Sequence, residues 1–184
     1  MATLRTRWWR TTAVLAVAAL GLAACAGQPG AAATVDGEAI SEAELAQTVA
    51  DWTQLAPATP ATVLQELVIS PFVIEAAAAA GVGASEEDGR EVLLAAAEDA
   101  GVDPADLHIG PGLLLIGQRF AAQDAALEAS KGRVIEEAAT TAIRDAEIQV
   151  NPRYGAWEDL GVVAVRPPWF VGAATPAAAV TPAP

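Results

Sequence analysis

The first 24 residues limit what can fold in this chain, because they have the three parts of a secretory signal. Arg5, Arg7 and Arg10 carry positive charge, and no acidic residue precedes Cys25. An apolar run then covers residues 11–22 and leads into small residues. This arrangement is typical of a cleaved signal peptide, whereas a bilayer-spanning helix needs about 20 apolar residues. We therefore expect residues 1–24 to be removed and the fold to be built from the residues after them.

Cys25 is the only cysteine of the chain, and it ends the small-residue stretch. The sequence Leu22-Ala23-Ala24-Cys25 resembles the lipobox of bacterial lipoproteins. The resemblance implies that the Cys25 thiol carries a diacylglyceryl group, that cleavage occurs before it, and that the new amine can be acylated. Two alternatives are a plain secretory signal with an incidental cysteine and an uncleaved N-terminal anchor. Lipidation accounts best for a cysteine that has no disulfide partner in the chain, so we expect a lipid anchor on the extracytoplasmic side of the cell membrane.

The charge that remains after cleavage restricts the possible partners. Loss of residues 1–24 leaves seven basic residues against 23 acidic ones, a formal charge of −16. Nucleic acid is excluded as a partner, because phosphate binding needs a positive surface. A polybasic contact with anionic lipid is disfavoured for the same reason. We expect the membrane lipid to be contacted through acylated Cys25.

Residues 33–165 carry the pattern of one folded domain. About 130 residues can bury roughly two thirds of their unfolded surface without a metal or a disulfide. Residues 25–32 predict a short tether rich in glycine, proline and alanine. Residues 166–184 have a Pro/Ala/Thr composition that cannot form a core, so we expect a disordered tail.

The start of this domain predicts a hairpin followed by a capped helix. Asp36-Gly37 favours a two-residue turn within residues 34–40, since both residues tolerate positive φ. Ser41 and Glu44 have the spacing of a capping box, which begins the first helix.

Three more helices and two strands come next in the pattern. A helix over residues 61–80 is apolar on most sides and contains Pro71, which predicts a kink or a restart near Ser70. Another begins after Ser85. The longest is expected over residues 113–144, weakened at Gly132, with an apolar stripe that includes Leu127 and Val134. Residues 146–150 and 162–165 predict strands.

Three segments resemble the SurA N-terminal-domain-like lipoproteins of high-GC Gram-positive bacteria. These are the hairpin over residues 33–40, the helix with Ser70-Pro71-Phe72, and the run after Val150. The most specific part of the resemblance is Asn151, Pro152, Arg153, Tyr154, Gly155 and Trp157. The resemblance implies that the N-terminal hairpin pairs with a strand near the C-terminus and that the helices lie between them. The fold class we expect is α+β, mostly α-helical, with such a small sheet.

The same resemblance implies chaperone-like binding of unfolded exported polypeptides. We expect an apolar groove between the helix over residues 63–80 and the long helix to hold them. SurA and PrsA also carry parvulin prolyl-isomerase domains, for which residues 101–113 leave no room, so isomerase activity is not expected. The alternative is a structural or adaptor lipoprotein that binds one folded envelope partner.

Catalytic and metal-binding patterns are weak. His108 is the only histidine, and no Gly-x-Ser-x-Gly sequence accompanies it, so a surface or loop-packing role is favoured. Glu86, Glu87 and Asp88 lack EF-hand spacing and suit the positive end of a helix. We expect no catalytic residue, no metal and no cofactor. For the segment 151–157 a structural role is favoured over ligand binding.

Overall fold

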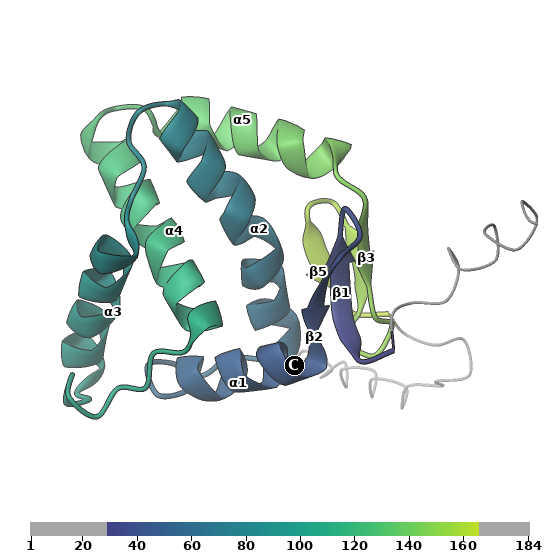
Figure 1. Cartoon of the computed structure of the whole chain (residues 1–184), viewed down its shortest axis with the longest axis horizontal. Helices are drawn as coiled ribbons and strands as arrows, with labels where there is room; N and C mark the ends of the chain where they lie inside the picture. The colour runs from purple at the N-terminus through teal and green to yellow at the C-terminus, as the bar shows by residue number, and fades with distance from the viewer. Residues whose placement is uncertain (1–28, 166–184) are drawn as a thin grey trace, which may run out of the picture.

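The computed structural model of the chain describes residues 29–165, and within them two short strands come before five consecutive helices and three short strands follow them (Figure 1). The elements in chain order are β1 (Ala31–Val35), β2 (Glu38–Ser41), α1 (Glu42–Trp52), α2 (Pro60–Ala79), α3 (Glu86–Ala100), α4 (Pro111–Glu128), α5 (Gly132–Asp145), β3 (Ile148–Val150), β4 (Ala156–Glu158) and β5 (Gly161–Val163). The predictions for the signal peptide, the lipobox Leu22-Ala23-Ala24-Cys25 and the C-terminal tail lie outside the described residues.

A three-stranded sheet joins the two ends of the described chain. β1 and β2 form an antiparallel hairpin, and its turn residues Asp36 and Gly37 have φ values of 50° and 84°. β3 pairs antiparallel with the other edge of β1, which gives the order β2-β1-β3. The expected fold is therefore confirmed: it is α+β and mostly helical, with a small sheet that pairs the N-terminal hairpin with a C-terminal strand.

The fold begins earlier than the predicted boundary at residue 33. β1 begins at Ala31, and Ala32 is fully buried. The backbone N–H of Asn151 donates to the Ala32 carbonyl at 2.9 Å. Small residues suit a flexible tether, but they also suit a strand packed closely under helices. Residues 31 and 32 thus belong to the domain, and their assignment to the tether was wrong.

Side-chain caps fix the beginnings of three helices. The Ser41 hydroxyl accepts from the Glu44 N–H at 3.0 Å, but the reciprocal bond of the predicted capping box is not made. The reciprocal box occurs instead at α3. There the Ser85 hydroxyl accepts from the Asp88 N–H at 3.2 Å, and the Ser85 N–H donates to the Asp88 carboxylate at 2.7 Å. Thr59 caps α2, with Pro60 in the first turn.

The helix predicted over residues 113–144 is two helices. α4 ends at Glu128, and Ser130 in the link has a φ of 57°. The Lys131 ammonium donates to the Ala80 carbonyl at the end of α2 at 2.6 Å, which ties the link to that helix. Because Gly132 is a poor helix former, the chain can turn here at low cost, and α5 crosses α2 (Figure 1).

This break changes which side chains are buried. α5 buries Ile135, Ala139 and Ile143. Leu127 and Val134, which the predicted stripe placed inside, are 70% and 57% exposed. A continuous helical period cannot be carried across the turn, so the predicted stripe was wrong from Leu127, near the end of α4, onward.

α2 is the central helix. It contacts α1, α4, α5, β1 and β5, and it runs through Pro71 without the predicted restart. By length and composition it is the one described helix that could cross a membrane, but its packing among five elements is that of a core helix. Pro71 has no N–H, so the Leu67 carbonyl lacks its usual helical donor.

Two close contacts complete the domain. α3 and α4 cross where Gly89 faces Gly117, with space for no side chain at either position. β4, which the sequence did not predict, pairs antiparallel with β5, the strand expected near residues 162–165. This second small sheet is held to α2 by the Val162 N–H, which donates to the Gln65 side chain at 3.2 Å.

Candidate functional site

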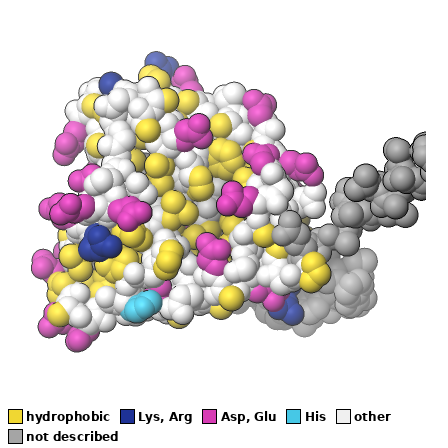
Figure 2. Space-filling view, in the orientation of Figure 1, with side chains coloured by type: hydrophobic (Ala, Val, Ile, Leu, Met, Phe, Trp, Pro, Cys, Tyr) yellow, Lys and Arg dark blue, Asp and Glu magenta, His cyan; other side chains and the backbone are white. Residues whose placement is uncertain are grey.

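An apolar groove lies between the β1–β2 hairpin and α2. Its volume is about 370 Å³, within the range of small ligand sites. The apolar lining consists of Val35, Ala39, Ile40, Leu67, Val68, Pro71, Phe72 and Leu115, and the acidic lining of Asp36, Glu38, Glu44 and Glu75. Figure 2 shows hydrophobic side chains over the middle of this face with acidic ones around them.

The groove exists because α2 is apolar on more sides than its neighbours cover. Leu67 and Val68 are buried and form the floor. Phe72, one turn further along, and Leu115 of α4 are only half-buried and form walls. The opposite wall is the hairpin, which contributes Ile40.

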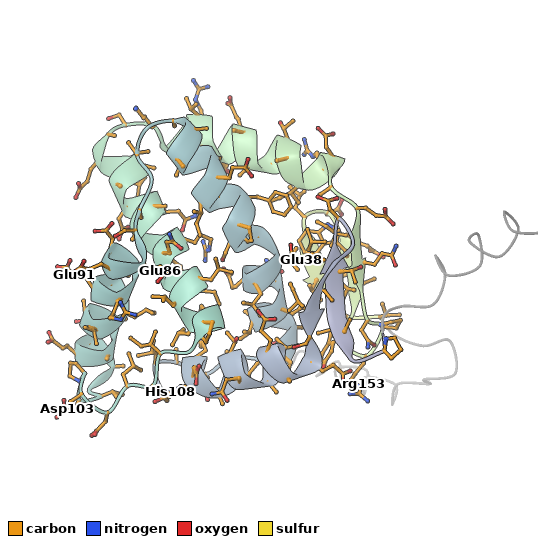
Figure 3. All side chains as sticks on the ribbon, viewed as in Figure 1. Glu38, Glu86, Glu91, Asp103, His108 and Arg153 are labelled. Carbon is orange, nitrogen blue, oxygen red and sulfur yellow. The ribbon has the colours of Figure 1, made fainter. Side chains whose placement is uncertain are left out.

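The rim of the groove is negative. Asp36, Glu38, Glu44 and Glu75 are exposed, and no Lys or Arg belongs to the lining. One oxygen of Asp36 accepts from the Glu147 N–H at 2.8 Å. The other three carboxylates make no ion pair with any described residue. Figure 3 shows Glu38 between α2 and the sheet.

The strand that borders the groove is an edge strand, and the backbone N–H and carbonyl of one of its residues face outward. The backbones of Ala32 and Asp36 hydrogen-bond on the β3 side of β1, each at 2.9 Å. The alternate residues Ala33 and Val35 therefore face β2. Their partners on β2 are Ile40 and Glu38, and Ala39 lies between these two. The N–H and the carbonyl of Ala39 therefore point away from β1, on the edge that borders the groove.

A groove was expected between the helix over residues 63–80 and the long helix, but α2 and α4 pack directly over most of their contact. Residues of α2 and Ile116 of α4 share one buried cluster. Arg119 of α4 is 5% exposed and is hydrogen-bonded to Glu66 of α2 and to Gln123. Burial lowers the pKa of Arg119, and the adjacent Glu66 carboxylate opposes that shift. The observed groove therefore lies mainly between α2 and the hairpin, and of the long predicted helix only Leu115 lines it.

His108 has a partner that the sequence did not predict. Its Nδ1 lies 2.8 Å from the carboxylate of Asp51, which is 2% exposed at the end of α1. That carboxylate also accepts from Gln47 at 2.8 Å and from the Gly110 N–H at 3.1 Å. Figure 3 shows His108 below α1, in the loop before α4.

This network holds a loop to a helix. Gln54 adds two bonds to the backbone of His108, at 3.1 and 3.3 Å. No serine, threonine or cysteine side chain of the described residues is hydrogen-bonded to His108. The contacts agree with the loop-packing role that the sequence favoured. An acidic residue next to the apolar Trp52 was the only sequence signal for a buried carboxylate.

The segment from Asn151 ties β3 to the start of the fold. The Asn151 side chain donates to the Ala31 carbonyl at 3.1 Å and accepts from the Arg153 N–H at 3.1 Å. Arg153 donates to Glu42, the first residue of α1, at 3.2 Å. Figure 3 shows Arg153 at the same end of the sheet, and Pro152 is exposed in the turn.

The rest of this segment packs inward. Tyr154 and Trp157 are half-buried against the larger core cluster. Gly155 has a φ of 143°, and a Cβ there would collide with the Val163 carbonyl, so only glycine fits. These contacts agree with the structural role that the sequence favoured, and none of the segment's residues lines the groove.

The acidic start of α3 is likewise a helix cap. Hydrogen bonds with the Ser85 side chain and then its backbone lower the pKa of Asp88. Glu86 and Glu87 are exposed beside it. In residues 29–165 no three His, Cys, Asp or Glu side chains lie close enough together to hold a metal ion.

Comparison with known proteins gives this chain no relative. No protein-family model matches it, and neither a curated protein nor a solved structure does.

Proposed function

We propose that this chain is a lipid-anchored extracytoplasmic protein whose domain binds short extended segments of unfolded polypeptides in the groove between the hairpin and α2. One observation carries the proposal: an apolar groove of about 370 Å³ borders an edge strand on which the backbone N–H and carbonyl of Ala39 point outward. Extended peptides commonly bind by adding a strand to such an edge, while alternate side chains enter adjoining pockets.

The dimensions of the site favour weak, sequence-tolerant binding. A bound segment exchanges main-chain hydrogen bonds with Ala39, which do not depend on the side chains of the segment. Its apolar side chains contact Leu67, Val68 and Phe72. A groove of this size holds only a few residues, so release is fast. Such binding protects unfolded chains from aggregation without trapping them.

Two further supports come from the sequence. The lipobox Leu22-Ala23-Ala24-Cys25 favours attachment of the domain to the membrane. The resemblance to SurA N-terminal-domain-like lipoproteins favours the same activity, although the groove lies elsewhere than that resemblance led us to expect. Both remain proposals, and no enzymatic activity forms part of them.

The test uses the chain from Ala26 to Pro184, which retains all described residues and lacks only the signal and Cys25. Binding of labelled unfolded polypeptides is measured by fluorescence anisotropy. Ala39→Pro removes the outward N–H, and proline is tolerated where an edge N–H faces solvent. Since one net hydrogen bond contributes about 1 kcal/mol, we expect roughly fivefold weaker binding.

Ala39→Val is the matched control, because valine keeps the N–H and favours a strand. Its affinity should stay near that of the unmodified chain, and circular dichroism should give both variants the same fold. Absence of binding to any unfolded polypeptide, together with one stoichiometric folded partner in pull-downs, would select the adaptor alternative instead. Retention of the Cys25→Ala variant in membranes would contradict the lipid anchor.

A further inference from the structure

We infer that the groove selects extended segments that carry a lysine or arginine next to apolar side chains. This inference rests on the proposed function and names the class of polypeptide bound. Its basis is charge complementarity between the rim of the groove and such a segment, together with the polar groups that the groove presents.

The rim carboxylates come from three separate elements. Asp36 and Glu38 belong to the hairpin, Glu44 to α1 and Glu75 to α2. They surround the apolar floor and lie apart from one another, since no three acidic side chains of the described residues are close enough together to hold a metal ion. An extended segment can therefore place successive cationic side chains against different carboxylates.

The fold does not neutralise this rim with its own cations. Arg119 is bound to Glu66, and Arg153 to Glu42. Lys131 donates to a backbone carbonyl at the far end of α2. None of these cations lines the groove. The carboxylates thus remain available, and the domain as a whole is strongly acidic.

The remaining polar groups also favour donors from the ligand. Besides the rim carboxylates, the outward-facing carbonyl of Ala39 is an acceptor at the edge of the groove. An apolar floor with acceptors at its margin suits lysine and arginine, whose methylene stems lie on apolar surface while the charged head reaches outward. A neutral or acidic segment keeps the main-chain hydrogen bonds and the floor contacts but gains no ion pair with the rim.

The experiment measures binding of one alternating peptide in three versions, with lysine, glutamine or glutamate at its polar positions. The protein is again the chain from Ala26 to Pro184, and anisotropy is recorded at low and high ionic strength. Exposed ion pairs each change affinity by a few-fold, so two or three of them should give the lysine version about tenfold tighter binding than the glutamine version. The difference should shrink at high salt, where exposed charges are screened.

Two double variants locate the effect. Glu38→Gln with Glu75→Gln should bring the lysine peptide to the affinity of the glutamine peptide and leave the glutamine peptide unchanged. Glu91→Gln with Glu98→Gln makes the same change of net charge on the exposed side of α3, and it should preserve the preference.

The outcomes separate this inference from the proposed function. Equal affinity for the lysine and glutamine peptides overturns charge selection and leaves polypeptide binding standing. Binding of no version overturns both. Equal loss of preference in the two double variants assigns the effect to net charge and overturns the role of the groove. If the lysine peptide binds only after removal of residues 166–184, the chain's own tail is the occupant, and the inference is likewise overturned.

Discussion

The crossing of α3 and α4 makes a sharp prediction about stability. A Cβ placed on Gly89 would lie 2.5 Å from the backbone nitrogen of Gln118 and 2.7 Å from its Cα. A Cβ on Gly117 would lie 2.6 Å from the Gly89 carbonyl oxygen. The atoms met first are backbone atoms, so no rotamer change can relieve the collision. Gly89→Ala must therefore push the two helices apart.

The size of the effect is set by opposing contributions. Carbon atoms pack best at about 3.5–4.0 Å, so the helices must separate locally by roughly 1 Å. Overpacking costs about 1–3 kcal/mol, and a rigid backbone contact favours the upper end. Alanine restores about 1 kcal/mol through its better helix propensity. The net loss in the free energy of unfolding is about 2 kcal/mol, which lowers Tm by about 7 °C in a domain of this size.

Thermal unfolding by circular dichroism measures this change on the chain from Ala26. Gly132→Ala is the matched control, because its Cβ would meet only a Leu127 methyl group at 3.4 Å. The same substitution there should leave Tm unchanged or raise the stability by at most about 1 kcal/mol. If Gly89→Ala behaves like Gly132→Ala, the close crossing of α3 and α4 is refuted.

Three further predictions concern charged groups. Glu66→Leu should lower the free energy of unfolding, measured with denaturant, by about 3 kcal/mol, because it leaves the buried Arg119 charge unpaired. Adding Arg119→Met should restore much of that loss, and an equal loss in the double variant would contradict this reasoning. Asp51→Ala should cost about 2 kcal/mol by the same measurement, since a buried carboxylate with three hydrogen bonds is removed, and an unchanged unfolding midpoint would show that the network contributes nothing. The hydrogen bonds from Ser85 lower the pKa of Asp88 below its ordinary 3.8, so the carboxylate stabilises the fold fully above pH 3.8 and loses that effect as the pH falls through the lowered pKa. The Tm values of Asp88→Asn and the unmodified chain should therefore differ at neutral pH and converge in acid, whereas a constant difference would argue against the cap.

Much of the local structure could be predicted from the sequence. The turn at Asp36-Gly37, the beginning of α1 after Ser41 and the beginning of α3 after Ser85 all occur where expected. In each case the deciding interaction joins residues within one turn of chain. A hydrogen bond from a cap or a positive φ at glycine depends on neighbours in sequence, so it can be read before the fold is known.

The candidate site could be predicted only in its parts. The hairpin and the apolar helix α2 were both expected, but the groove was expected between α2 and the long helix over residues 113–144, whereas the structure has it mainly between α2 and the hairpin. Which apolar face of α2 remains uncovered depends on how α4 and the hairpin pack against it. The acids of the rim come together from positions as distant as Asp36 and Glu75, and no local pattern relates them.

Tertiary packing also decided the two boundaries that the sequence placed wrongly. Ala31 and Ala32 became part of β1 because Ala31 pairs with Ser41 of β2 and the Ala32 carbonyl accepts from the Asn151 N–H. The helix expected over residues 113–144 divides at Ser130 because α5 packs across α2. Local propensity at these positions is weak enough that alternatives differ little in free energy. The sequence by itself therefore determined the turns, the caps and the α+β class, because those depend on neighbouring residues. The tertiary structure decided where the chain is covered, where it breaks and where it leaves a groove, because those depend on burial against residues far away in the chain.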